Sequence, residues 1–320
     1  MAVTVRKNPD LFTECLPTKG GGRSAFGEAG SPSVETIQQK RRREYECFCY
    51  LHAPEASRTG VDLRPRAALN FTSRRSLQGT DSERTLLTQA STDFMTLTYF
   101  GHSTFQIETK GQTILVDPFF TDNPHTDVRP SDLSPDVIVL THAHFDHWGD
   151  TPAIAERTGA LVISNFEVTN YLTQQHGHEN VQPLNEGGSM DYEWGSIEAT
   201  HARHTSSFPD GTYGGTPNGH IFHIEGGCIY NTGDTAPFAE MEWIGEDHDV
   251  DLALMPIGDC FTQGIDKAVD AVTMIDPALT VPLHYDTFPP IEVDMDDWRS
   301  AVGDEGYETR VIDFGETLEL

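Results

Sequence analysis

Four side chains that can bind a metal ion lie within six consecutive positions of the sequence. They are His142, His144, Asp146 and His147. Imidazole nitrogens and carboxylate oxygens are ligands of zinc, and also of manganese and iron. An apolar run over residues 136–141 precedes the cluster, and a helix start follows it. The pattern therefore predicts a metal site on a loop between a buried strand and a helix, where a rigid frame positions functional side chains.

The pattern H-x-H-x-D-H in this cluster resembles the signature of the metallo-β-lactamase superfamily. Further segments resemble, in the same order along the chain, a family of metal-dependent hydrolases that is similar to the bacterial L-ascorbate 6-phosphate lactonase. These segments are residues 101–103, 116–119, 231–235, 256–259 and 281–289. The resemblance covers about residues 95–320. It implies a mixed α/β fold, a four-layer αββα sandwich in which two sheets pack together and helices cover the outside.

The resemblance also implies two metal ions that are held by seven side chains. Two histidines of the cluster and one far downstream would bind the first ion. The remaining aspartate and histidine of the cluster would bind the second ion together with a C-terminal histidine, and another aspartate would bridge both ions. The implied metal ligands are His142, His144, Asp146, His147, His204, Asp234 and His284.

The downstream ligand of the first metal ion has two candidates. His204 is preferred because the family usually has histidine, glycine and serine in succession there. In this sequence Thr205 stands in place of the glycine, so the match is incomplete. His201 is the alternative ligand.

The implied ligands suit hydrolytic chemistry. Two cations about 3.5–4 Å apart share a water molecule and lower its pKa toward neutrality, which gives a hydroxide nucleophile. One cation then stabilises the negative charge that develops on the substrate. Asp146 and Asp234 offset part of the metal charge, and His102 either meets the substrate or is a buried structural histidine. These three form the predicted catalytic set. Asp117 is either a hydrogen-bond partner of a ligand histidine or a turn residue before proline.

These features predict a metal-dependent hydrolase that attacks a lactone, an ester or a phosphodiester. It would use two divalent ions, with zinc as the first candidate and manganese or iron as alternatives. The substrate is expected to be a small molecule, and a homo-oligomer is plausible. A nuclease of the tRNA-processing type is an alternative, but it needs basic residues for phosphate, and residues 95–320 hold only 7 Lys and Arg. No nucleic-acid partner is therefore expected. The second alternative is a catalytically silent metal-binding scaffold, which would not need a bridging aspartate.

Alternating or continuous apolar runs predict the strands and helices that position these residues. The expected strands are residues 97–100, 104–108, 113–117, 136–141, 161–164, 196–200, 221–225, 228–232, 252–257, 280–284 and 309–313. One expected helix begins near residue 150 or 151 and ends before Gly159. The other expected helices cover residues 167–175, 238–244, 267–275 and 294–302.

The charge of the chain is uneven. Its 21 Lys and Arg face 50 Asp and Glu, a net charge of −29. Residues 1–94 hold 14 basic and 11 acidic residues, so residues 95–320 carry a net charge of −32. A body of this charge repels itself at low salt, whereas molar salt shortens the Debye length to about 3 Å. The sequence therefore favours a salt-adapted protein of a halophile over an ordinary acidic protein.

Residues 1–94 differ from the rest of the chain because they show no sustained period of 2 or 3.6. We expect them to be a disordered extension or a mis-assigned start, with a small regulatory domain as the alternative, and residues 95–320 to form the hydrolase domain. No apolar run is long enough to span a membrane, and the N-terminus lacks the pattern of a secretory signal. A cytoplasmic location without membrane contact is expected.

Overall fold

A computed structural model describes residues 95–320 of the chain. The expectation for residues 1–94 lies outside the described residues. Within the described part, no helix combines the length and the apolar character that crossing a membrane would require.

Seven strands form the first sheet, in the order β13-β1-β2-β3-β4-β5-β6. Strands β3 to β6 run parallel to one another, and the pairs β13–β1, β1–β2 and β2–β3 are antiparallel. The bounds are β1 Thr96–Gly101, β2 Thr104–Thr109, β3 Gln112–Val116, β4 Val137–Val139, β5 Leu161–Ser164, β6 Val181–Pro183 and β13 Thr317–Glu319.

Six strands form the second sheet, in the order β12-β11-β10-β9-β8-β7. Here β10, β11 and β12 are parallel, whereas β7 to β10 pair antiparallel. The bounds are β7 Ser189–Tyr192, β8 Gly195–His201, β9 Asn218–Ile224, β10 Gly227–Asn231, β11 Leu252–Pro256 and β12 Leu279–Leu283.

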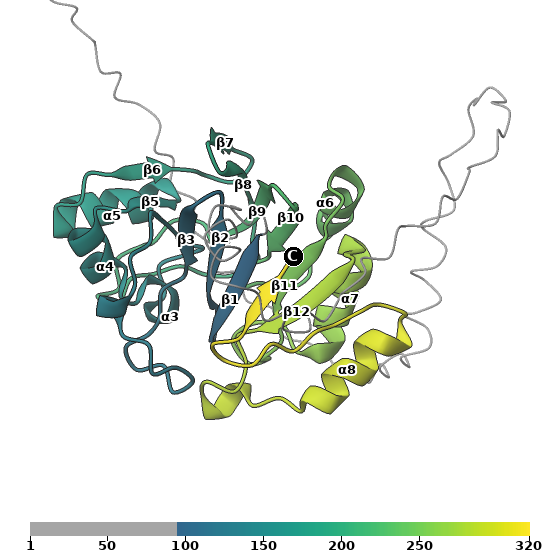
Figure 1. Ribbon diagram of the computed structural model, residues 1–320. Helices are drawn as coiled ribbons and strands as arrows, with labels where there is room; N and C mark the ends of the chain where they lie inside the picture. The colour runs from purple at the N-terminus through teal and green to yellow at the C-terminus, as the bar shows by residue number, and fades with distance from the viewer. Residues whose placement is uncertain (1–94) are drawn as a thin grey trace, which may run out of the picture. The chain divides into compact units, whose positions relative to one another are not determined.

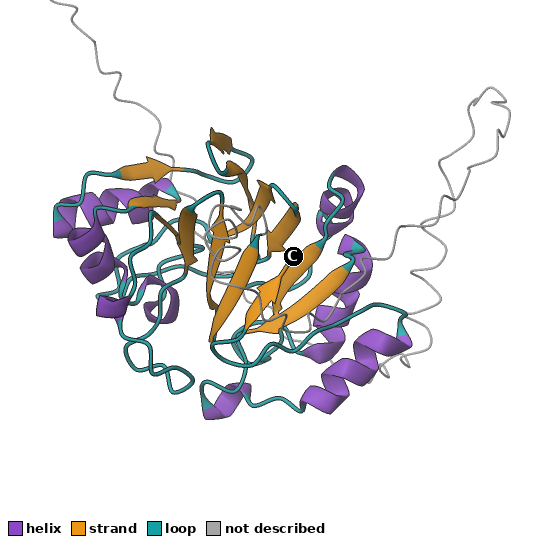
Figure 2. Cartoon of the chain, viewed as in Figure 1, coloured by secondary structure: helices purple, strands orange, loops and turns teal. Residues whose placement is uncertain are grey.

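The two sheets pack face to face, and the helices lie on their outer faces (Figures 1 and 2). The inner faces share one apolar core, in which Phe105 of the first sheet and Phe222 of the second are fully buried. A second core lies under the helices of the second sheet and a third under those of the first. The helices are α3 Phe145–Trp148, α4 Thr151–Thr158, α5 Phe166–His176, α6 Met241–Asp247, α7 Ile265–Ile275 and α8 Met295–Asp304. The four-layer αββα arrangement is therefore confirmed.

The candidate ligands follow strands that end at one edge of this sandwich. Loops after β1, β3 and β4 carry them from the first sheet, and loops after β8, β10 and β12 from the second. Because parallel strands end at the same edge of a sheet, residues far apart in the sequence meet there. The left-handed backbone of His102, Asp117 and His284 (φ 56°, 43° and 53°) turns the chain sharply at three of these strand ends. Such conformations are costly for residues other than glycine and cluster at functional sites.

Most predicted elements are present, but the last strand is not where the sequence indicates. Within residues 309–313, Thr309 forms one isolated bridge with Thr280. The chain then turns at Gly315 (φ 81°), and β13 pairs antiparallel with β1. The prediction was wrong because Ile312 contributes to the core from an irregular segment, so its apolar character did not require a strand.

Candidate metal centre

Three histidine rings form a first group of candidate ligands. The Nε2 atom of His142 lies 2.9 Å from Nδ1 of His144, and Nε2 of His204 lies 3.3 Å from the same atom. His142 is fully buried, whereas the other two rings are partly exposed. All three nitrogens lie within 4.8 Å of one another, close enough to bind one metal ion.

A second group of four side chains lies beside the first. It consists of His102, Asp146, His147 and His284. The Oδ2 atom of Asp146 lies 3.1 Å from Nε2 of His102 and 3.8 Å from Nε2 of His284. All three histidines are buried. The sequence predicted three members of this group as metal ligands, and the structure adds His102, which was predicted to meet the substrate.

The carboxylate of Asp234 lies between the two groups. Its Oδ2 atom is 3.2 Å from Nε2 of both His147 and His284, which belong to the second group. The same atom is 3.6 Å from Nε2 of His204 and 4.0 Å from Nε2 of His142 in the first group. Asp234 is only 3 % exposed. This is the place that a bridging carboxylate would take.

A hydrogen-bond network fixes the ring of His147. The carboxylate of Asp117 accepts from the backbone N–H of Thr141 at 2.8 Å and from its hydroxyl at 2.7 Å. Its Oδ2 atom also lies 2.8 Å from Nδ1 of His147. Because a carboxylate accepts only, Nδ1 must carry a proton, and Nε2 points toward Asp234. Asp117 is therefore the partner of a candidate ligand histidine, one of the two roles that the sequence left open.

The ring of His102 is held in the same way. Its Nδ1 atom lies 2.9 Å from the hydroxyl of Thr287, and its Nε2 atom lies 3.1 Å from Oδ2 of Asp146. Because a carboxylate accepts only, the ring proton sits on Nε2, and Nδ1 accepts from the hydroxyl of Thr287. Burial and the neighbouring His284 lower the pKa of His102 to about 3, which keeps the ring neutral at pH 7. A cation between Nε2 and the carboxylate of Asp146 would replace this single proton, as metal binding to histidine does.

The charges of the cluster also fit a metal ion. Burial alone would raise the pKa of Asp234, but His147 and His284 hold it well below its usual range, so the carboxylate is charged. Burial alone would lower the pKa of His147, but the carboxylates of Asp234 and Asp117 raise it well above its ordinary value. Two buried atoms that face the centre have no hydrogen-bond partner: Nε2 of His147 and Oδ1 of Asp234. A divalent cation would replace the proton at Nε2 of His147 and could bind the free carboxylate oxygen.

Comparison with known proteins agrees with this geometry. The family model described as "Beta-lactamase superfamily domain" matches residues 96–284, which include every candidate ligand of both groups.

The chain belongs to the β-lactamase superfamily.

Relatives in this superfamily identify the chain as a metal-dependent hydrolase. A UPF0173 metal-dependent hydrolase of Salinibacter ruber is 57 % identical over 226 residues, which are 71 % of this chain and 100 % of the relative. A second, of Shouchella clausii, is 48 % identical over 231 residues, 71 % of this chain and 100 % of the relative. The solved structure of Igni18, a metallo hydrolase from Ignicoccus hospitalis, has 38 % sequence identity and a TM-score of 0.65 and covers 71 % of this chain and 98 % of that one.

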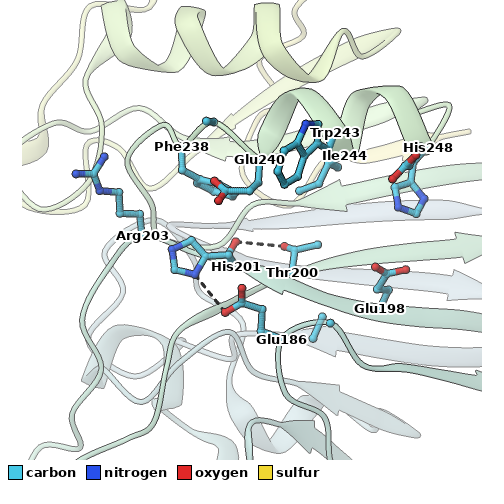
Figure 3. Close-up of a pocket in the computed structure, with 14 residues that line it drawn as sticks. Glu186, Glu198, Thr200, His201, Arg203, Phe238, Glu240, Trp243, Ile244 and His248 are labelled. Carbon is cyan, nitrogen blue, oxygen red and sulfur yellow. Dashed lines mark hydrogen bonds and ion pairs between the residues drawn. The ribbon is translucent and has the colours of Figure 1, made fainter. Parts of the chain in front are cut away.

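His201 lies apart from the two groups of candidate ligands. Its Nδ1 atom is 3.3 Å from Oε2 of Glu186, and its side chain is 38 % exposed. Figure 3 shows the ring beside Arg203 in a separate cavity of about 760 Å³ between β8 and α6. No candidate ligand lines this cavity. The geometry therefore favours His204, the preferred residue of the sequence prediction.

Proposed function

We propose that this hydrolase cleaves a lactone or an ester of a small molecule. Two divalent metal ions, with zinc as the first candidate, would be held by the two groups of side chains. The observation that carries the proposal is the shared position of Asp234, whose Oδ2 atom lies within 3.2–4.0 Å of ligand nitrogens from both groups. A carboxylate with this reach supports a dinuclear site over a mononuclear one. When bound, such an ion pair supplies a hydroxide nucleophile at neutral pH and stabilises the oxyanion.

The residues of the chain would act by holding and orienting. Asp117 keeps a proton of His147 on Nδ1, and Thr287 holds Nδ1 of His102, so both Nε2 atoms stay directed at the centre. The carboxylates of Asp146 and Asp234 offset part of the cation charge. His102 enters this proposal as a candidate ligand of the second ion, because its Nε2 atom lies 3.1 Å from Asp146 and belongs to the same group of candidate ligands.

Turnover with a matched pair of variants tests the proposal. The metal-loaded full-length protein is assayed in molar KCl with γ- and δ-lactones, aliphatic esters and a phosphodiester. His147→Ala should lower kcat/KM for a lactone or ester by at least about a hundredfold, since it removes a ligand. The control His201→Ala should retain activity, because that ring lies outside both groups. No turnover of any lactone or ester by the loaded parent would contradict the proposal.

A further inference from the structure

Three phenylalanine rings stand together next to the candidate metal centre. Phe119 follows β3, Phe145 lies between two candidate ligands, and Phe288 follows β12. The ring of Phe145 is 6.0 Å from that of Phe119 and 6.1 Å from that of Phe288, and these two are 6.4 Å apart. We name these three residues the phenylalanine triangle. Two loops and the first residue of α3 provide the rings, so the fold, and not one local motif, brings them together.

The phenylalanine triangle touches the candidate second metal group. The ring of His102 lies 5.5 Å from Phe119 and 5.5 Å from Phe288, in edge-on contact with both. Phe119 is buried and Phe288 is half-buried, whereas Phe145 is 55 % exposed. The triangle therefore continues from the buried His102 outward to solvent. A wall of this kind offers apolar surface to a substrate group that approaches the metal centre from outside.

The seven Lys and Arg side chains of residues 95–320 have partners other than the phenylalanine triangle and the candidate ligands. Five of the seven form ion pairs with nearby carboxylates: Lys110–Glu225, Arg129–Asp132, Lys267–Asp270, Arg299–Asp296 and Arg310–Glu316. The other two donate to backbone carbonyls: Arg157 to those of Pro130 and Leu133, and Arg203 to that of Pro237. Arg203, which precedes His204 in the chain, lines the separate cavity of Figure 3.

A phosphate or a sugar phosphate is usually bound by arginine or lysine in addition to a metal ion. In the described part of the chain, the hydrogen bonds and ion pairs of the basic side chains involve neither the phenylalanine triangle nor a candidate ligand. This observation disfavours a substrate that carries a phosphate.

We propose that the substrate is a neutral lactone or ester whose acyl or alkyl chain packs against the phenylalanine triangle. The proposal rests on the hydrolase function proposed above and names the substrate class of the same site. The carbonyl group would lie at the metal centre, and the apolar chain would run along Phe288 and Phe145 toward solvent. Phe145 and Phe288 are thus specificity-determining residues.

Two length series test this proposal. The first measures kcat/KM for unbranched esters with acyl chains of four to eight carbons, beside one phosphodiester. The second measures the dissociation constants of aliphatic carboxylates of the same lengths, which are products of such reactions and bind whether or not turnover occurs. Both use the metal-loaded full chain and the variants Phe145→Ala and Phe288→Ala. Phe166→Ala is the matched control, because Phe166 is also exposed (54 %) but lies on α5, outside the triangle. The metal content of every variant is measured.

We expect kcat/KM and carboxylate affinity of the parent to rise about twofold to fourfold per added methylene, the range set by partial to full burial of each group. Phe145→Ala and Phe288→Ala should flatten both series without loss of metal, and Phe166→Ala should not. A flat ester series with good turnover would overturn the proposal and leave the hydrolase function intact. Length-dependent carboxylate binding without ester turnover would support the apolar wall and contradict the hydrolase function. Faster cleavage of the phosphodiester than of every ester would also overturn the proposal.

Discussion

Two of the three histidine rings of the second metal group are oriented by a hydrogen bond at Nδ1, which directs Nε2 at the centre. For His147 the partner is the carboxylate of Asp117, and for His102 it is the hydroxyl of Thr287. Orienting a ring in advance lowers the cost of metal binding, and for His147 the carboxylate also fixes the tautomer.

Asp117→Asn should weaken metal binding by about tenfold to a hundredfold, the usual effect of losing such a partner. An amide can replace only one of the two accepting oxygens, so either His147 or the backbone of Thr141 loses its acceptor. Competition with a chelator measures the affinity. Asp122→Asn is the control, since Asp122 is exposed in the following turn. Equal affinities of Asp117→Asn and the parent would refute the orienting role.

His204→Ala should lose metal from the first site, while His201→Ala should keep it. The reason is distance: His204 lies 3.3 Å from a nitrogen of His144, whereas His201 pairs with Glu186 in another cavity. Elemental mass spectrometry of both variants, each normalised to protein concentration, checks the pair. The opposite pattern, with metal lost from His201→Ala, would reverse the assignment.

Seven of the residues that meet at the centre could be found in the sequence. Four of them lie within six consecutive positions, and the others follow strands in recognisable motifs. The part played by His102 could not be found, because its neighbours Asp146 and Thr287 are 44 and 185 residues away. A pattern along the chain carries no information on such contacts. The same is true of the phenylalanine triangle, whose members come from two loops and the start of α3.

Strand β9 carries a buried histidine that makes the free energy of unfolding depend on pH. His220 on this strand is fully buried, and neither ring nitrogen has a hydrogen-bond partner. Burial lowers its pKa to about 3.

His220→Leu should remove part of the acid sensitivity of folding. Between pH 7.5 and 5.5, His220 should cost the parent about 1.4 kcal/mol of unfolding free energy, the linkage expected for one such group. Urea unfolding of the chelator-treated protein at both pH values measures the loss for parent and variant. Phe222→Leu on the same strand is the control, because it alters packing without removing a titratable group. A loss of the same size in His220→Leu as in the parent would contradict this account.

Elements with a clear apolar period could be predicted closely, and those without one could not. Strand β5 has the predicted bounds, and α5 and α4 end before Gly177 and Gly159 in left-handed conformation. Strands β6 and β7 were missed because both are short edge strands whose residues are partly or fully exposed. Edge strands are held by backbone pairing with a neighbour, which leaves little trace in the side-chain pattern.

Acidic residues far outnumber basic ones in the part of the molecule that the structure describes. The described residues carry 39 Asp and Glu against 7 Lys and Arg, and the basic residues already have partners. At low ionic strength the remaining carboxylates repel one another, and salt screens this repulsion.

Stability should therefore rise with salt. Between 0.1 and 2 M KCl we expect the unfolding free energy to increase by about 2 kcal/mol or more, or about 4–8 °C in Tm for a domain of this size. Urea, which is uncharged, is the suitable denaturant for the titration. Sucrose of equal osmolality serves as the control for effects unrelated to charge. Equal stability at both salt concentrations would contradict the prediction of a salt-adapted protein.

The number of metal ions per chain tests the central claim most directly. Elemental mass spectrometry is applied to the folded full-length parent, to Asp234→Asn and to His201→Ala, all purified in molar KCl after loading with zinc and desalting. We expect two ions per chain in the parent and in His201→Ala, and fewer than two in Asp234→Asn, because Asp234 is the only side chain placed between both groups of described ligands. One ion or none in the folded parent, or two ions retained in Asp234→Asn, would contradict a dinuclear centre bridged by this carboxylate.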